Sequence, residues 1–378
     1  MSALHGDLTG CLGRRLAGLV DALKAPTRCQ SLDLQGWSEL LATARASNLL
    51  GALAVALGDA GVVGPGQAQR HLSGAVLTGQ RQRLSVQWEA QNLQRAIAEQ
   101  GVPLVLLKGA AYVMASHEPA LGAGRLFGDI DVLVPRAALE DVESALLVAG
   151  WVSAKTDPYD QRYYRQWMHE IPPMQHIHRG TVIDVHHTIL PLTARNAPDP
   201  AQIIARATPV PGLPALRVPA PEDLVVHSIT HLVHEGELHN GLRDLYDIHS
   251  MLTRFGAEPA FWQRLLASGA GNDLAGPLVL GLRLVMAVFE TAVPAEVLGT
   301  LDAQAAPHWR RRWWPAVYAQ AMRPENDEEA GMAAALARQW IYIRSHALRM
   351  PLPLLVRHLS VKAWKGLWPE ERPPQAEA

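Results

Sequence analysis

The sequence has few of the residues that mark a secreted, disulfide-linked or membrane-spanning protein. Only two cysteines, Cys11 and Cys29, occur in 378 residues, and their spacing is not that of metal ligands. Two cysteines do not make a disulfide framework, and a cytoplasmic location is expected. The first residues hold no basic segment followed by an apolar core, so no secretory signal is expected. No apolar run reaches the length needed to span a bilayer.

The chain also has almost no net charge. The 34 Lys and Arg residues almost balance the 36 Asp and Glu residues, which gives a net charge of −2. Such a balance provides no electrostatic basis for nucleic-acid binding, so we expect no nucleic-acid partner. The 48% hydrophobic content is enough for real cores, and the 19% charged content argues against wholesale disorder. The length predicts two or three domains.

Residues 102–134 carry the most informative pattern in the chain. Val102–Leu107 is a short apolar run rich in leucine and valine, which predicts a buried strand. Helix-forming residues follow at 110–116, and a loop with proline and glycine covers 117–127. Residues 129–134, Asp-Ile-Asp-Val-Leu-Val, then alternate and predict a second strand.

The second strand carries two acids on one face. Because side chains of a strand alternate between its faces, Asp129 and Asp131 point to one side and Ile130 to the other. Adjacent carboxylates repel each other, and a cation that binds both removes this penalty. Hard oxygen ligands suit Mg²⁺, which commonly also binds substrate phosphates. The pair alone is equally compatible with a solvated strand end that caps the following helix.

A third acid lies on a predicted hairpin. Residues 174–187 read as two strands around Arg179-Gly180, and Asp184 alternates with the apolar residues on either side of it. His186 falls on the same face as Asp184. The other interpretation of this motif is the exposed face of an edge strand.

Together these motifs resemble the nucleotidyltransferase fold of the DNA polymerase β type. More closely, LLKGAAY at 106–112, Arg125, GDIDVLV at 128–134 and IDVHH at 183–187 are similar to the uncharacterised bacterial nucleotidyltransferases, whose hallmark is Leu-Lys-Gly with an arginine ahead of Asp-Ile-Asp. The resemblance covers about residues 35–300 and implies an α+β fold, a mixed sheet with helical regions before and after it. One departure is Ala110, where the polymerase type has serine or glycine.

The resemblance implies a Mg²⁺-dependent enzyme. It would move a nucleoside monophosphate from a nucleoside triphosphate, expected to be ATP, to an acceptor hydroxyl on a small molecule, peptide or protein. The residues implied as catalytic and as Mg²⁺ ligands are Asp129, Asp131 and Asp184. The residues expected to bind the nucleotide are Lys108, Gly109, Arg125 and His186, of which Lys108 and Arg125 are chemically fit to hold phosphate.

Composition and periodicity divide the chain into six expected segments. They are a helical N-terminal region at 1–100, the α/β core at 101–192, a proline-rich linker at 193–221 with a short helix near 201–207, a helical domain at 222–323, a basic helical C-terminal region at 324–368 and a disordered tail at 369–378. Within the first segment, a helix over 67–100 has two apolar stripes, one of them formed by Leu77, Leu84 and Trp88. Two stripes predict that this helix is packed on both sides.

A row of histidines leaves a different enzyme class open. His227, His231 and His234 fall on one face of a helix predicted over 224–234. Such a row can bind zinc or iron, as in a His/Asp metal phosphohydrolase. The sequence has no His-Asp dipeptide, and a structural helix face explains the same pattern.

The C-terminal region leaves a binding role open. Residues 331–368 contain arginines, lysines and three tryptophans but no Asp or Glu. This composition suits an anionic membrane surface or a protein partner, and it also suits a final helix with solvated basic ends. The corresponding alternative function is a non-catalytic nucleotide-binding or membrane-associated module with the same fold.

Overall fold

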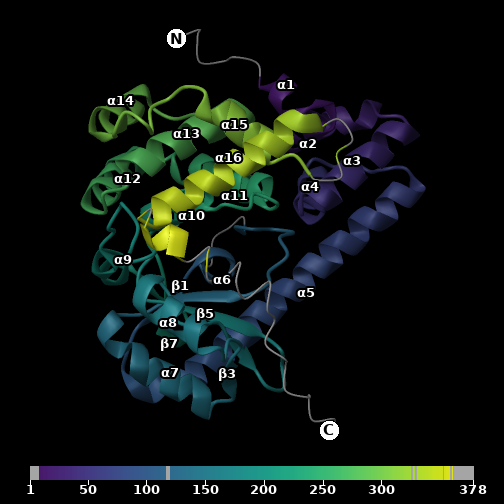
Figure 1. Cartoon of the computed structure of the whole chain (residues 1–378). Coiled ribbons are helices and arrows are strands. Elements are labelled where there is room, and N and C mark those ends of the chain that lie inside the picture. The colour runs from purple at the N-terminus through teal and green to yellow at the C-terminus, as the bar shows by residue number, and fades with distance from the viewer. Residues whose placement is uncertain are drawn as a thin grey trace.

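The computed structural model describes residues 8–115, 120–324, 327, 330–351, 353–357 and 360. It is a mixed α/β fold in which a seven-stranded sheet lies in one half of the molecule and most of the helices lie in the other (Figure 1). The strand order is β3-β4-β5-β2-β1-β7-β6. The strands are β1 (Leu104–Leu106), β2 (Ile130–Leu133), β3 (Trp151–Ser153), β4 (Met174–His176), β5 (Val182–His186), β6 (Thr208–Val210) and β7 (Leu213–Val218). The predicted fold class is confirmed.

Strand β2 lies at the centre of the sheet. Every residue of β2 is buried, as expected for the apolar Ile130, Val132 and Leu133 of a central strand, and the burial includes the charged Asp131. It pairs antiparallel with β1 and parallel with β5. The parallel register places Asp131 beside Asp184 and Leu133 beside His186. The two acid-bearing strands are therefore direct neighbours.

Residues 193–221 contain the short helix predicted within the linker, and in addition two strands of the sheet. They form α9 (Pro200–Arg206) and the strands β6 and β7. β7 pairs parallel with β1, with Leu216 beside Leu104, and so completes the sheet. The proline content conceals these strands because Pro209 lies in β6, the last strand of the sheet, where a missing N–H group is tolerated.

The N-terminal helices join the two halves of the molecule. They are α1 (Thr9–Leu12), α2 (Arg14–Lys24), α3 (Leu34–Ala46), α4 (Leu50–Asp59) and α5 (Gly66–Ile97). Figure 1 shows α5 running from the helical half to the sheet. One face of α5 is buried through Val86, Leu93 and Ile97, but Leu77, Leu84 and Trp88 are each at least half exposed. Helix α5 contacts α3 and α4 as well as β7, so it lies between the N-terminal helices and the sheet as predicted, but these contacts do not bury the stripe formed by Leu77, Leu84 and Trp88.

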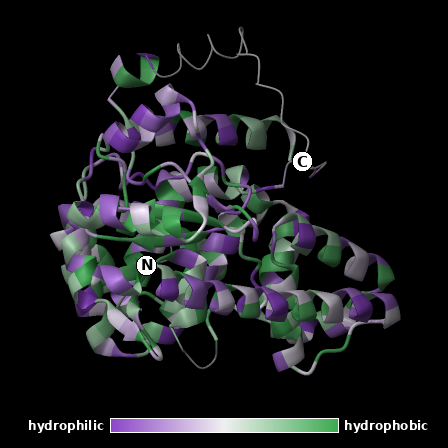
Figure 2. Ribbon diagram, turned by 90° about the horizontal axis from the view of Figure 1, so that it is seen from below, coloured by the Kyte–Doolittle hydropathy of each residue, from purple (hydrophilic) through white to green (hydrophobic). Residues whose placement is uncertain are grey.

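The remaining helices cover the sheet or form the helical half. Those beside the sheet are α6 (Lys108–Met114), α7 (Leu139–Val148) and α8 (Pro158–Trp167). Those of the helical half are α10 (Pro221–His234), α11 (Gly241–Phe255), α12 (Pro259–Gly271), α13 (Ala275–Phe289), α14 (Ala295–Gln304), α15 (Trp314–Ala321) and α16 (Gly331–Arg349). Hydrophobic and hydrophilic residues alternate along most of these helices, as expected for elements with one buried face (Figure 2).

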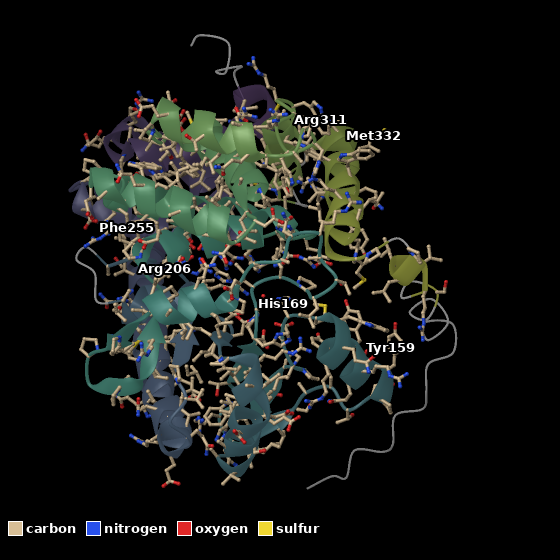
Figure 3. All side chains as sticks on the ribbon, turned by 90° about the vertical axis from the view of Figure 1, so that its left-hand side faces the viewer. Tyr159, His169, Arg206, Phe255, Arg311 and Met332 are labelled. Atoms are coloured by element: carbon tan, nitrogen blue, oxygen red, sulfur yellow. The ribbon has the colours of Figure 1, made fainter. Side chains whose placement is uncertain are left out.

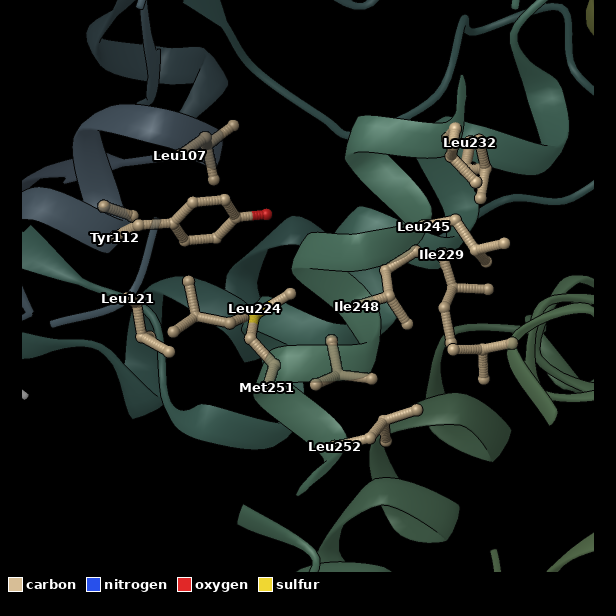
Figure 4. Packing of buried hydrophobic residues seen from close by; sticks show 14 of the residues in the cluster. Leu107, Tyr112, Leu121, Leu224, Ile229, Leu232, Leu245, Ile248, Met251 and Leu252 are labelled. Atoms are coloured by element: carbon tan, nitrogen blue, oxygen red, sulfur yellow. The ribbon is translucent and has the colours of Figure 1, made fainter. Parts of the chain in front are cut away.

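Helix α10 is the centre of the helical half. It packs against α11, α12, α13 and α16, and also against α6 beside the sheet. At the contact with α6, the Tyr112 and Ser228 hydroxyls are hydrogen-bonded at 2.6 Å. Figure 4 shows Leu107 and Tyr112 on one side of this core and the apolar residues of α10 and α11 on the other. The helical half is therefore packed directly on the sheet half at the start of α6.

No helix in the described part of the chain is both long and apolar enough to cross a bilayer. The tail expected at 369–378, and Trp364 and Trp368, lie outside the described residues.

Candidate active site

Three acids meet where β2 and β5 lie side by side. Asp129 directly precedes β2, and Asp131 and Asp184 are paired in the register. One carboxylate oxygen from each of the three lies within 4.8 Å of the others. Asp131 is 3% exposed, Asp184 is partly buried and Asp129 is exposed. The face predicted from alternation along the two strands is thus a single cluster that opens towards solvent at Asp129.

Asp131 is held between two side chains at the centre of this cluster. The Lys108 ammonium donates a hydrogen bond to Asp131 Oδ1 at 2.7 Å, and His186 Nε2 lies 3.1 Å from the same oxygen. Burial alone would raise the pKa of Asp131, but Lys108 and His186 more than offset it and hold that pKa well below its ordinary value. Asp131 is therefore ionised throughout the neutral range.

Lys108 begins α6 in an unusual backbone conformation. Its φ is 43°, in the left-handed region that residues with a side chain seldom adopt. Such a conformation costs on the order of 1 kcal/mol and is found preferentially at functional sites. Burial lowers the pKa of Lys108, while the Asp131 carboxylate raises it, and the net shift is upward. Lys108 is therefore a permanent positive charge against the acid cluster.

The next residue, Gly109, is constrained by the loop that leads to β2. A Cβ at Gly109 would lie 2.5 Å from a ring carbon of Phe127, so a side chain does not fit there without movement. The same loop carries Arg125, whose guanidinium contacts Asp247, lies 3.5 Å from Asp244 Oδ1 and sits over the Tyr112 ring. Arg125 is thus paired with carboxylates of α11 in this structure.

A cleft of about 360 Å³ lies between this loop and the helical half. The sheet side contributes Lys108, Asp129 and Asp131 to its wall, and the helical side contributes His231, Arg243 and Asp244. Two of the three acids therefore face a space large enough for part of a substrate.

Asp184 is the cluster member whose electrostatic environment is least favourable. Burial, with further repulsion from Glu170, Asp131 and Asp129, raises its pKa to about 8. Its Oδ1 is buried without a hydrogen-bond partner among the described residues. An unsatisfied buried acceptor beside other carboxylates is costly, and a hard divalent cation would remove both the repulsion and the missing bond. The residues present therefore fit a Mg²⁺ ion.

Two residues of this region are not identifiable from the sequence patterns. His169 and Glu170 run antiparallel along β5, because Ile171 N–H donates to the Val185 carbonyl at 3.0 Å and His187 N–H to the His169 carbonyl at 2.8 Å. Glu170 is thereby paired with His186. Two consecutive prolines at 172–173 separate this segment from β4, so the strand alternation is interrupted before it reaches Glu170.

The histidine row on α10 does not gather around one point. His227 and His234 are buried, and burial lowers the pKa of each to about 3. His234 Nδ1 is bonded to the Thr230 carbonyl at 2.9 Å, whereas His231 lines the cleft 3.7 Å from Glu235. Within the described residues, no set of three potential metal ligands includes any of the three histidines. His227 and His234 therefore belong to the buried part of α10, and His231 lies at the cleft.

Comparison with known proteins agrees with this geometry. A family model described as uncharacterised nucleotidyltransferase matches residues 33–290, more than half of the chain. No curated protein and no solved structure matches the chain. The matched span includes the whole sheet, the three acids and Lys108. The chain belongs to this family of uncharacterised nucleotidyltransferases.

Proposed function

We propose that this chain transfers a nucleoside monophosphate from a nucleoside triphosphate, ATP in the first instance, to a hydroxyl group of an acceptor. Family membership supports nucleotidyl transfer in general terms. The observation that carries the proposal is the meeting of the Asp129, Asp131 and Asp184 carboxylates within 4.8 Å at the wall of a cleft. The acceptor class is a small molecule, a peptide or a protein.

The three acids would hold Mg²⁺. Bound Mg²⁺ would neutralise the triphosphate and stabilise the charge that develops on the attacking and leaving oxygens. Asp131, with its strongly lowered pKa, would contribute a full negative charge at any neutral pH. Asp129, the exposed member, would be the first of the three that an ion entering from solvent meets.

Lys108 and Arg125 would bind the phosphates. Lys108 lines the cleft and provides a compact point charge for phosphate oxygens. Arg125 lines the same cleft, and its planar guanidinium would exchange the Asp247 carboxylate for phosphate oxygens. Gly109, between them in space, would keep Phe127 close enough for this loop to form the wall.

Asp184 and His186 would act on the acceptor side. In the metal-free chain the pKa of Asp184 is raised to about 8, and bound Mg²⁺ would lower it by cancelling the repulsion from the other acids, so that the ionised carboxylate could take a proton. The acceptor hydroxyl would give its proton to Asp184 while its oxygen bonds to the α-phosphorus, and the bond from the α-phosphorus to the bridging oxygen would break to release pyrophosphate. His186 is fully buried against Asp131 and would orient that acid.

The test follows the α-phosphate and the γ-phosphate of ATP separately. The protein is incubated with Mg²⁺ and a fractionated bacterial lysate as the source of acceptors, using ATP labelled at the α-phosphate or at the γ-phosphate. The proposal expects the α-label in an acceptor fraction and the γ-label only in pyrophosphate, with both signals lost in Asp131→Asn. Label transfer from the γ-phosphate would make the protein a kinase and overturn the proposal.

A second proposal is that α16 lies on an anionic membrane surface. The exposed residues of α16 include no charged side chain, and Met332, Leu336, Trp340 and Ile343 are each 51% to 79% exposed. These four recur at helical spacing and form one apolar stripe. An exposed stripe with tryptophan is typical of helices that lie in the membrane interface.

Charge supports lipid as the occupant of this stripe. Arg310, Arg311 and Arg312 are exposed, and the same segment packs against α16 because Arg344 stacks on Trp309 and Trp314. Arg311 and Met332 lie on the same side of the molecule (Figure 3). Exposed arginines beside an apolar stripe match anionic lipid headgroups.

A further inference from the structure

The side of the acid cluster away from Asp129 holds a second group of potential metal ligands. His169, Glu170 and His186 each present one ligand atom, and these atoms lie within 4.8 Å of one another. Glu170 Oε2 is 3.3 Å from His186 Nε2 and 3.9 Å from His169 Nε2. Ligands bound to one ion at about 2.0–2.2 Å are separated by similar distances.

The two imidazoles converge through the same ring nitrogen. In both His169 and His186, Nδ1 is buried and has no hydrogen-bond partner among the residues that the structure describes, so the polar contacts of each ring found there are made through Nε2. The ring centroids are 4.9 Å apart. Figure 3 shows His169 in the middle of the molecule, between the helical half and the elements of the sheet half. Two nitrogens and one carboxylate oxygen therefore face a common point inside the protein.

Backbone pairing holds this arrangement in place. Glu170 is paired antiparallel with His186, so their side chains lie on the same face of the sheet. His169 is fixed by the hydrogen bond from His187 N–H to its carbonyl. Strand register thus places Glu170 and His186 together, and His169 joins them from the bend that precedes Glu170.

We infer that His169, Glu170 and His186 form a binding site for a divalent first-row transition metal, separate from the carboxylate site proposed for Mg²⁺. Imidazole nitrogen is a good ligand for zinc, cobalt and iron and a poor one for Mg²⁺, which prefers oxygen. Two imidazoles and one carboxylate leave further coordination positions for water.

The inference predicts different metals for two neighbouring sites. The carboxylate cluster offers only oxygen, and the histidine cluster offers two nitrogens and one oxygen. Excess Mg²⁺ should leave a transition metal in place, because Mg²⁺ does not compete well for imidazole. Binding does not require nucleotide, so it is measured independently of transfer activity.

The test uses Co²⁺ as the probe, added to the full-length protein without nucleotide. The visible absorption of protein-bound Co²⁺ is expected to saturate at one equivalent and to persist in excess Mg²⁺. His169→Ala should weaken Co²⁺ binding at least tenfold, and Glu170→Gln, which keeps the side-chain volume, should do the same. The matched control is Asp129→Asn, which should keep Co²⁺ binding while it weakens Mg²⁺ binding.

Three outcomes would overturn the inference. They are the absence of saturable Co²⁺ binding to the wild type, displacement of Co²⁺ by Mg²⁺, and loss of binding in Asp129→Asn with retention in His169→Ala. Circular dichroism of each variant shows whether it is folded, and if His169→Ala is not, Glu170→Gln decides the question. Failure of Co²⁺ binding would leave the nucleotidyl-transfer proposal standing, because that proposal rests on Asp129, Asp131 and Asp184.

Discussion

Replacing Asp184 by asparagine should make the metal-free protein more stable, although it should remove transfer activity. Asp184 is partly buried among three other acids, and its Oδ1 has no partner among the described residues. Asparagine has nearly the same shape but no charge, so it removes the repulsion without leaving a cavity. An acid that weakens the metal-free fold is consistent with the role proposed for Asp184, in which the residue binds an ion and does not serve stability.

The size of the effect follows from the carboxyl pKa. In the folded chain the pKa of Asp184 is about 8, against 3.8 for the ordinary carboxyl. The unfolded chain therefore releases the proton that the folded chain keeps, and at pH 7 this difference corresponds to about 4 kcal/mol. Partial exposure of Asp184 screens the interaction, so we expect a gain of about 2 kcal/mol for Asp184→Asn.

The direction in which stability changes with pH is a stronger test than the size of the stability gain. Because the folded pKa is raised, the wild type loses stability as pH rises from 3.8 towards about 8. Asparagine does not titrate, so the difference in unfolding free energy between Asp184→Asn and the wild type should be close to zero near pH 3.8 and largest near pH 8. The assay is urea unfolding in EDTA at several pH values across this interval.

Asp129→Asn is the matched control. Asp129 belongs to the same cluster but is exposed to solvent, so its replacement should change stability by less than about 0.5 kcal/mol at every pH. Adding Mg²⁺ should then stabilise the wild type and leave Asp184→Asn nearly unchanged. Equal stability of wild type and Asp184→Asn at the upper pH limit would refute the reasoning, as would a gain that does not grow with pH.

Three further predictions follow from other parts of the structure. Asp131→Asn should change stability in the opposite direction from Asp184→Asn, because it leaves the largely buried Lys108 ammonium without its partner, and it should lower the unfolding free energy by about 2–3 kcal/mol. Unchanged stability in urea titrations would contradict this. Burial lowers the pKa of His234 to about 3, so above that pH the residue takes up a proton only when the chain unfolds, and its contribution to the unfolding free energy should fall below pH 6.5, by about 3 kcal/mol at pH 4. His234→Gln should remove this loss, and an unchanged pH dependence of stability in the variant would contradict the prediction. Replacing both Leu336 and Trp340 by serine should reduce co-sedimentation with vesicles that contain phosphatidylserine, and unchanged binding, or binding to neutral vesicles alone, would argue against a membrane role for α16.

The sequence predicts the centre of the fold well because local periodicity is strong there. Alternation in residues 129–134 and 182–186 places Asp131 and Asp184 on polar faces, and both segments are strands in adjacent register. Lys108 could also be singled out, since it is the one charge that ends an apolar strand. What the pattern does not contain is the pairing of Lys108 with Asp131, because that contact depends on how the two strands are placed in the sheet.

The failures of sequence reasoning have physical causes of the same kind. Strand β7 joins the sheet beside β1, more than a hundred residues earlier in the chain, and a proline-rich context conceals it. Glu170 enters the site through pairing with β5 across an interruption of two prolines. Leu77 and Leu84 have the spacing of a buried stripe, yet they are exposed in the described structure. Periodicity shows which residues share a face but not whether another element covers that face.

The most direct test of the account is a crystal structure with Mg²⁺ and an ATP analogue that cannot be cleaved between the α- and β-phosphates. The account predicts an ion bound by Asp129, Asp131 and Asp184, with ligand distances of about 2.1 Å, and triphosphate oxygens in the same coordination sphere. Lys108 should have turned from Asp131 towards the phosphates. An ion beside His231, or an analogue bound away from the three acids, would contradict it.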